Sequence, residues 1–521
     1  MLLMAFIHPL KATVYYVRID GKDTNTGKTD SPEGAWKSVK TAATRVKGGD
    51  QVLVADGTYS EGEIIFNAGS NTKAIPILFQ SANRHGAKIV STSIYHAFNL
   101  GNSVAVTIDG FDITFQEKTT SEYHGINVGG NWNVIRNCKI HGAPFSGIQG
   151  YLCDNLLIEN NTLYDNCKGT GIKVHENGSG ISIYHPISRQ AGEGFHIIIR
   201  NNFIYNNVAL NNVGSTGFPT DGNGIIMDDF HCGQNWDKDL TKLTNYPYPS
   251  LVENNLIVNN GGRGVHVFSS DQVTMRNNTC YHNGWKLDDY SMDPGDLTVE
   301  SGKNNVIVNN IAVSRPDLKR GGAIRIALDN STTQVKNNLV AGPKLLSSWS
   351  TNVKLDNTNK TSGSALFPAF VNPSYEPASA NFHLKATSPA IGGGTNSNSA
   401  ETDFDGNARP LGSGIEMGCY EYDSTAVYTS VVIPSLDQTG FVVFPNPVTD
   451  QCTFQINTPK PAVVWLSILD LTGRVVGQKK YASLQGFNVF QYDTGGISNG
   501  IYMMCLHSNH QIISRKMVIQ H

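Results

Sequence analysis

A recurring asparagine pair constrains the fold of this chain more than any other feature. The pairs at 160–161, 201–202, 254–255, 277–278, 309–310 and 337–338 occupy the same place in successive copies of one unit. The compact copies repeat every 23 residues, as from Asn254 to Asn277. A repeat of this length is typical of a solenoid, in which each copy packs on its neighbours.

Each copy predicts three short strands. In RGVHVFSSDQVTMRNNTCYHN, apolar and polar residues alternate within each strand, so that Ile and Val point inward and the residues between them point outward. The repeats have no helical periodicity, which excludes a solenoid built of helices. We therefore predict an all-β fold: a right-handed parallel β-helix, or three-strand solenoid.

Asparagine suits the corner of such a coil for two reasons. It tolerates the left-handed backbone region, and its amide can bond to the asparagines of the copies above and below. We expect Asn254 and Asn277 to belong to this ladder, so that leucine at either position would lower the stability of the fold.

Length and charge limit the functions open to the chain. It has 521 residues, enough for more than one domain, and its net charge of −3 leaves no basic surface for nucleic acid. No apolar run approaches the ~20 residues of a membrane span. Residues 1–14 contain the stretch MLLMAFIHPLKA, which is either the remnant of a secretory signal or an ordinary flexible N-terminus. We expect a monomer.

The coil is predicted to span residues 15–360 and to begin with a cap. Residues 15–60 read as strand, loop, helix (35–46) and strand, and they resemble the N-terminal cap of secreted right-handed parallel β-helix proteins. Residues 361–422 contain SPAI, TDFDGNARP and IEMGCYEY, which resemble the closing segment of bacterial β-helix proteins. We expect this closing segment to cap the coil, and residues 423–440 to form a linker.

The C-terminal stretch, residues 441–521, has a pattern of its own. Its motifs Pro-Asn-Pro, Asp-Leu-Thr-Gly-Arg and Gly-Ile-Tyr are similar to those of the sorting domain of the Bacteroidetes type IX secretion system. The resemblance implies a small β-sandwich, recognition by the type IX machinery, and export to the cell surface or the medium, usually with removal of the domain. It implies no catalytic role.

Alternation predicts two outward rows on the Gly-Ile-x-Val strands. The first is expected to run Asn127, Gln149, Lys173, Ile226, His266, Thr298 and Arg325, and the second His175, Asp228, Phe268 and Glu300. Since neighbouring rungs lie ~4.8 Å apart, Lys173 and His266 would stand about 10 Å apart, with room for a sugar ring between them. Both are candidate bases, and each could equally be an ordinary solvated or ladder residue.

Charged residues gather around the same strands. Asp221, Asp228 and Asp229 are hard oxygen donors that suit Ca²⁺, although Asp228 and Asp229 could instead accept backbone hydrogen bonds in a turn. Arg263 could clamp the carboxylate of a uronic acid through two hydrogen bonds, or it could be an exposed corner residue.

Long insertions follow GIKVHE and GIIMDDF, and a third precedes TDGNG. Long loops on a regular scaffold are where function concentrates, so we expect them to wall a cleft. The residues expected to contact substrate are His175, Glu176, Tyr184, His185 and Trp236. The alternative is that the aromatic residues among them only pack the loops.

Residues 15–343 resemble the pectate-lyase-like β-helix superfamily, especially the capped polysaccharide lyases. Those of the family-9 type carry a rung close to GNGFKLG, in which Lys is the base and Asp residues on neighbouring rungs hold Ca²⁺. This chain has GNGIIMDDF there, with Ile226 at the lysine position, and Lys173 stands one copy earlier.

The resemblance and the residues together favour a secreted, Ca²⁺-assisted polysaccharide lyase that cleaves an acidic glycan by β-elimination. Lys173 or His266 would remove the proton, and Arg263 would stabilise the charge that develops. One alternative is an inverting glycoside hydrolase, whose acid and base would come from Asp221, Asp228 and Glu176. Another is a non-catalytic surface adhesin or glycan-binding protein.

Overall fold

The computed structural model describes residues 13–66, 72–116, 123–169, 177–209, 219–234, 244–289, 292–328, 332–348, 355–377, 379–425, 442–444, 446–458, 462–470, 474–483, 486–508 and 511–521. The chain divides into two compact units. The first comprises Met1–Phe370 and His383–Ser424, and the second comprises Val371–Phe382 and Thr425–His521.

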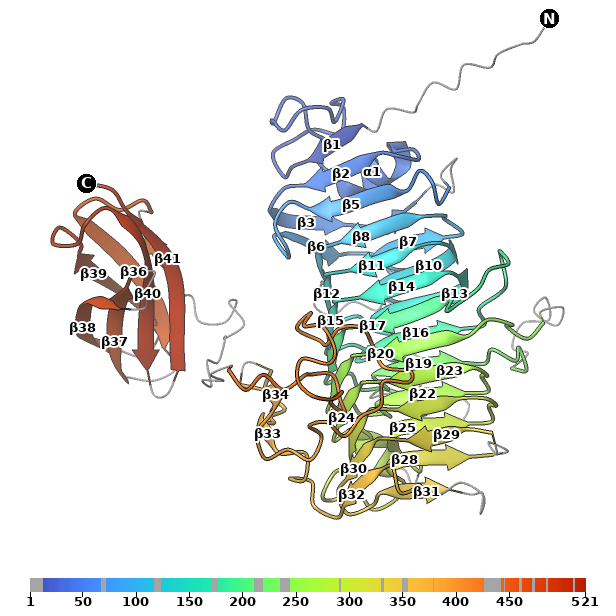
Figure 1. The fold of residues 1–521 in the computed structure, drawn as a ribbon. Helices are drawn as coiled ribbons and strands as arrows, with labels where there is room; N and C mark the ends of the chain where they lie inside the picture. Colours follow the sequence, from blue (N-terminus) through green and yellow to red (C-terminus); the bar gives the residue numbers. More distant parts are fainter. Residues whose placement is uncertain are drawn as a thin grey trace, which may run out of the picture. The chain divides into compact units, whose positions relative to one another are not determined.

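The first unit is a coil of three parallel sheets, each turn of which contributes one strand to each sheet (Figure 1). Sheet 1 contains β1 (Val14–Val17), β2 (Gln51–Val54), β5 (Ile77–Ser81), β8 (Val106–Asp109), β11 (Val134–Arg136), β14 (Leu156–Glu159), β17 (Ile197–Arg200), β20 (Ser250–Glu253), β23 (Val273–Arg276), β26 (Val306–Val308) and β29 (Gln334–Lys336). The predicted parallel β-helix is confirmed.

Sheets 2 and 3 complete each turn. Sheet 2 contains β4 (Ile64–Ile65), β7 (Phe98–Gly101), β10 (Ile126–Asn131), β13 (Ile148–Asp154), β16 (Ile181–Tyr184), β19 (Ile225–Asp228), β22 (Val265–Phe268), β25 (Gly295–Glu300), β28 (Gly322–Ala327) and β31 (Leu346–Ser348). Sheet 3 contains β3 (Gly57–Glu61), β6 (Ala87–Ser91), β9 (Asp112–Phe115), β12 (Lys139–His141), β15 (Thr162–Tyr164), β18 (Phe203–Tyr205), β21 (Leu256–Val258), β24 (Thr279–Tyr281), β27 (Ile311–Val313), β30 (Leu339–Ala341) and β32 (Lys360–Ser362).

Alternation along the strands builds the core. In β22, for example, Val265 and Val267 are fully buried inside the coil, whereas His266 between them points outward. Helix α1 (Val39–Arg45) covers the first turn, where Ser38 accepts a hydrogen bond from the backbone N–H of Thr41 as its N-cap. A second short helix, α2 (Trp285–Asp289), lies between β24 and β25.

The two members of each asparagine pair have different tasks. The first member takes the left-handed conformation, with φ of 53° at Asn254 and 52° at Asn277. The second member forms the ladder inside the corner, where each Nδ2 donates to the Oδ1 of the next at 2.9–3.0 Å. This ladder contains Asn161, Asn202, Asn255, Asn278, Asn310, Asn338 and Asn359. The prediction that Asn254 and Asn277 are ladder members is therefore wrong.

A second ladder, which we did not predict although an asparagine recurs there in the repeats, follows the corner between sheets 3 and 2. It runs through Asn166, Asn207, Asn260, Asn283 and Asp296, again by Nδ2–Oδ1 hydrogen bonds. Burial raises the pKa of Asp296, which ends the ladder, to about 7.

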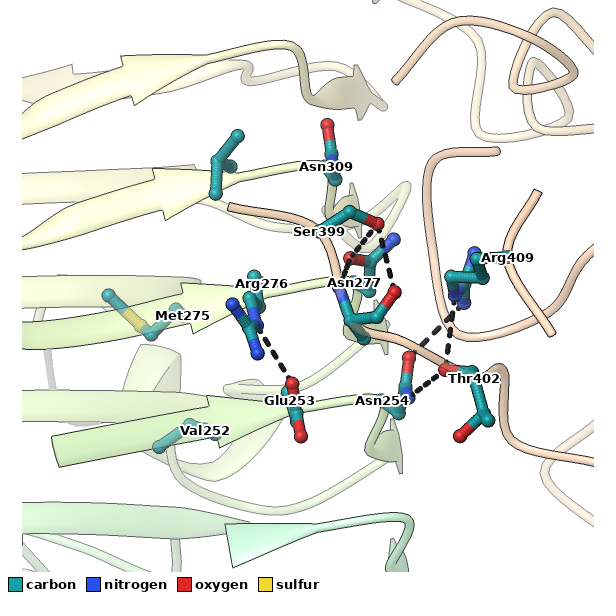
Figure 2. A network of polar contacts seen from close by, with 12 residues as sticks. Val252, Glu253, Asn254, Met275, Arg276, Asn277, Asn309, Ser399, Thr402 and Arg409 are labelled. Atoms are coloured by element: carbon teal, nitrogen blue, oxygen red, sulfur yellow. Dashed lines mark hydrogen bonds and ion pairs between the residues drawn. The ribbon is translucent and has the colours of Figure 1, made fainter. Parts of the chain in front are cut away.

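Part of the closing segment lies along the flank of the coil rather than across its end. This flanking segment, residues 395–421, bonds to the first asparagine of successive pairs (Figure 2). The Asn309 amide both donates to and accepts from the backbone of Thr395, and Asn254 donates to the carbonyl of Thr402 at 2.5 Å. The expectation that this stretch caps the coil is therefore wrong. Strands β33 (Phe370–Asn372) and β34 (Asn381–Leu384) form a separate two-stranded sheet.

The second unit contains two antiparallel sheets. One contains β35 (Val442–Phe444), β36 (Gln451–Thr458) and β39 (Gly486–Asp493). The other contains β37 (Ala462–Leu469), β38 (Val475–Ser483), β40 (Gly500–Ser508) and β41 (Gln511–Ile519). Apolar residues of both sheets, such as Phe454 and Leu466, share one core, as in the predicted small β-sandwich.

Candidate active site

Two outward rows of side chains run along sheet 2. The first contains Asn127, Gln149, Ser182, Ile226, His266, Thr298 and Arg325, in register across seven strands. The second lies two residues further along each strand and contains Tyr151, Tyr184, Asp228, Phe268 and Glu300. The first row is buried from Gln149 to Arg325, whereas the second is partly exposed.

The rows correct two predicted placements. Ser182 occupies the position predicted for Lys173, and Tyr184 occupies the position predicted for His175. The segments Gly-Ile-Lys-Val and Gly-Ile-Ser-Ile both carry the strand pattern, and the second of them forms the rung as β16. Four of the predicted site residues lie outside the described residues: Lys173, His175, Glu176 and Trp236.

His266 stands at the centre of the buried row, and neither of its ring nitrogens has a hydrogen-bond partner among the described residues. Its Nδ1 lies 4.0 Å from Asp221 Oδ1, and its Nε2 lies 3.8 Å from Glu300 Oε2. Both distances are too long for a hydrogen bond. Burial, reinforced by the nearby charge of Arg263, lowers the pKa of His266 to about 3. The imidazole is therefore neutral at ordinary pH.

Arg263 lies three residues before His266 and is 3 % exposed. One of its amino groups donates to the carbonyl of Thr220 at 3.1 Å, and its Nε has no hydrogen-bond partner in the part of the chain that the structure describes. The described part of the chain gives Arg263 no ion pair, and burial lowers the pKa of its guanidinium. An unpaired buried cation is costly, which favours an anionic ligand here. The alternative of an exposed corner arginine is excluded by this burial.

Thr298, Glu300 and Arg325 complete the site, although none was among the predicted site residues. Thr298 Oγ1 is fully buried on the strand next to His266, and no described residue hydrogen-bonds to it. Arg325 donates to Glu300 Oε2 at 2.7 Å. Burial opposes ionisation of Glu300, but the positive charges of Arg325 and Arg263 hold its pKa well below the usual range. Their outward positions were visible in the sequence, but their burial was not.

Asp229 is a structural residue rather than a free metal ligand. It is fully buried with φ of 51°, and it accepts hydrogen bonds from the His185 ring at 2.6 Å and from the backbone N–H groups of Gly233 and Gln234. Although burial opposes its ionisation, these bonds hold the pKa of Asp229 below its usual range. The turn interpretation therefore fits Asp229, and His185 is fully buried instead of facing a ligand.

Asp221, which accepts hydrogen bonds from Thr220 and Asn223, and Asp228, which accepts one from Gln234, are the two predicted carboxylates left as candidates for a cation. Burial and the charges of Asp221 and Asp229 raise the pKa of Asp228 well above its usual range. A cation would relieve this repulsion, and two carboxylates fit the oxygen chemistry of Ca²⁺. Over the described ranges, however, no three His, Cys, Asp or Glu side chains are grouped to hold a metal.

A buried carboxylate, Asp154 at the end of β13, joins the two long insertions that leave sheet 2. It accepts hydrogen bonds from the Tyr246 hydroxyl at 2.6 Å and the His196 ring at 2.9 Å. It also accepts from the backbone N–H groups of Arg189 and Gln190. No local pattern marks Asp154, because its partners lie 35–92 residues away in the chain.

Tyr184 lies beside the site, as predicted, but it belongs to strand β16 and not to an inserted loop. Its ring stacks on that of Tyr151 at 5.9 Å and on that of His185 at 3.9 Å. Its buried hydroxyl has no partner and lies next to Asp228 in the second row. Within the described residues, polar atoms without hydrogen-bond partners therefore occur on β16 and β22, the two neighbours of the strand that carries Asp228, and on β25 beyond β22.

Two family descriptions match the chain. Residues 15–305 match the Pel9A-like, right handed beta helix region. Residues 442–520 match the secretion system C-terminal sorting domain, which confirms the resemblance to the type IX sorting domain. This domain indicates export to the cell surface or the medium. Within the ranges described above, no helix is long and apolar enough to cross a membrane.

Several solved structures are similar, at low identity. One is a pectate lyase Pel9A, at 18 % identity over 79 % of this chain and 96 % of that chain, with a TM-score of 0.44. Another is XylC with xylose, at 11 % identity over 92 % of this chain and 100 % of that chain, with a TM-score of 0.39. A rhamnogalacturonan lyase matches at 14 % identity, over 70 % of this chain and 91 % of that chain, with a TM-score of 0.37. All three TM-scores are below 0.5, so these likenesses say nothing about how the chain acts. No curated protein matches it.

Proposed function

Because the chain belongs to the family of Pel9A-like right-handed β-helix proteins, we propose that it is an exported lyase that cleaves an acidic polysaccharide by β-elimination. The observation that carries the proposal is the buried group around His266: a neutral imidazole beside Arg263, a cation to which the described residues give no ion pair. A base and an unpaired cation are what removal of a proton next to a carboxylate requires.

In this mechanism the carboxylate of a uronic acid binds Arg263, and His266 removes the proton from C5. The electron pair of the C5–H bond forms the C4=C5 double bond, and the C4–O bond breaks. The departing oxygen takes a proton from solvent. Arg263 stabilises the negative charge that develops on the carboxylate, and Glu300, which pairs with Arg325, lies 3.8 Å from Nε2 of His266.

Two parts of the sequence-based proposal, the alternative base and the calcium ion, are also open to test. Lys173 remains an alternative base. Asp221 and Asp228 would hold Ca²⁺, which supplies positive charge that acidifies the C5 proton. Asp229 is not included, because its oxygens are occupied by His185 and the following turn.

The test is a set of acidic polysaccharides incubated with the full chain, with and without a chelator. A lyase produces the ultraviolet absorbance of the new C4=C5 double bond. New reducing ends without that absorbance would replace the proposal by hydrolysis. Binding without either product would make the protein a glycan-binding module.

Hydrolysis is a second candidate because of one pair of carboxyl groups. Asp228 and Glu300 stand in the same row two strands apart, which separates their backbones by about 10 Å. The pKa of Asp228 is raised and that of Glu300 is lowered, as in an acid and base pair. Inverting glycosidases hold their carboxyl groups about 6.5–9.5 Å apart.

Asp228→Asn is expected to separate these roles. If Asp228 binds Ca²⁺, the change should weaken calcium binding in a calorimetric titration and lower activity, and added CaCl₂ should restore part of the rate. If Asp228 is a glycosidase acid, the loss should be about 10²–10⁴-fold and indifferent to calcium. Asp229→Asn is the matched control, since it should lower the melting temperature without a selective effect on calcium binding.

The pH dependence of kcat/KM reports the protonation of His266. Its pKa of about 3 leaves the base deprotonated from pH 8 down to pH 5, so His266 should cause no loss of activity over that range. An ordinary histidine would cause an acid limb near pH ~6.5. A limb at that pH in the wild-type profile would contradict the proposed environment of His266.

A further inference from the structure

A second polar pocket lies on the flank of the coil, on the corner between sheets 1 and 3. It has a volume of about 470 Å³, which is in the usual range of ligand pockets, about 300–1,000 Å³. The floor is formed by the last residues of successive strands of sheet 1, and one wall is formed by Glu401 and Thr402 of the flanking segment. Figure 2 shows Thr402 of this wall facing Glu253 and Asn254.

The charges of the floor are balanced. Glu159, Arg200, Glu253 and Arg276 follow one another in register. Arg200 pairs with Glu159 at 2.8 Å, and Arg276 pairs with Glu253 at 2.8 Å. A further guanidinium, that of Arg84, donates to the backbone carbonyl of Asn160 at the pocket's edge. The pocket therefore offers neither the excess positive charge that an anion needs nor free carboxylates on its floor for a metal ion.

The edge of the pocket is a row of corner asparagines, and the flanking segment hydrogen-bonds to only some of them. Asn254 bonds to Thr402 and Arg409, whereas Asn201 reaches Asp403 only at 3.5 Å. Among the described residues, the exposed side chains of Asn160 and Glu401 have no partner. The row therefore presents an amide and a carboxylate, which together donate and accept hydrogen bonds.

We infer that this pocket binds a neutral sugar unit of a glycan, as a second, non-catalytic carbohydrate site. Hydroxyl groups of a sugar both donate and accept, which matches the side chains of Asn160, Arg200 and Glu401. Leu251 is the one apolar side chain of the lining, so a peptide would find none of the apolar anchors that carry most of its binding energy. The inference is independent of the chemistry proposed for sheet 2.

The test is calorimetric titration of the full chain with neutral β-1,4-linked xylo-, gluco- and galacto-oligosaccharides, with an oligogalacturonate as the acidic comparison. At least one neutral oligosaccharide should bind, and Asn160→Gly and Glu401→Ala should each raise its Kd by about fivefold or more, equivalent to ~1 kcal/mol. Glycine accepts the left-handed backbone of Asn160, whose φ is 57°, so the first change removes the amide without straining the corner.

Asn337→Gly is the matched control, because Asn337 is a corner residue with φ of 52° that lies outside the pocket. Its Kd should equal that of the wild type, and His266→Ala should also leave the binding unchanged. The inference is overturned if no neutral oligosaccharide binds, if neither pocket variant weakens binding, or if His266→Ala abolishes it.

Discussion

Replacing His266 by alanine is expected to lower kcat by about 10²–10⁴-fold, the range for loss of a general base. KM should change little, because Arg263 still binds the substrate carboxylate and an interaction made only in the transition state affects kcat. The imidazole is neutral, and no described residue competes for it by a hydrogen bond. The other described side chains of the first row are amides, hydroxyls, an isoleucine and an arginine, none of which is a base that could take its place. The measurement is the rate of appearance of the C4=C5 double bond.

Ser182→Ala is the matched control for this change, since Ser182 is a small buried polar residue of the same row, two strands away. It should keep the wild-type rate. Melting temperatures of both variants establish that they are folded. Full activity of His266→Ala together with loss in Lys173→Ala would transfer the role of base to Lys173, and full activity in both would remove the proposed base altogether.

Asn278→Leu is expected to lower the free energy of unfolding by about 2–4 kcal/mol. The amide of Asn278 is fully buried and bonds to Asn255, to Asn310 and to the carbonyl of Val252. Leucine would leave these buried groups without partners, each at a cost of about 1–3 kcal/mol, and its branched side chain does not fit the space of an amide. Denaturant unfolding of the coil measures the effect.

The control is Asn337→Gly, at a corner position outside the ladder. Its change in stability should stay within about 0.5 kcal/mol, as for exposed substitutions elsewhere, because glycine accepts the positive φ of Asn337. Equal loss of stability in both variants would mean that the backbone conformation of the corner matters and the buried amide ladder does not.

The fold was predictable because its rules are local and repeated. Alternation within strands such as 265–268, and an asparagine at each corner, recur so often that a chance arrangement is excluded. The ladder was also predictable, but its members were not. Asn277 and Asn278 are adjacent and chemically identical, and only the path of the backbone turns the second inward and leaves the first to the flanking segment.

The sequence predicted where on the coil the candidate site lies better than it predicted which residues form it. His266, Arg263 and Asp221 do lie together on sheet 2, as the sequence suggested. Glu300 was expected in the outward row with Asp228, and the register confirms that position, but its ion pair with Arg325 was not visible in the sequence.

The sequence by itself determined the coil, the sorting domain and the strands that carry the charged residues, because these follow from patterns within 20–30 residues. Tertiary structure decided the rest. The segment Gly-Ile-Ser-Ile forms the rung in which Gly-Ile-Lys-Val was expected, and Asp229 accepts a hydrogen bond from His185. Residues 395–421 lie along the flank of the coil. Each of these outcomes depends on hydrogen bonds between residues more than 30 positions apart, and the amino acids at either end carry no local signal of their partner.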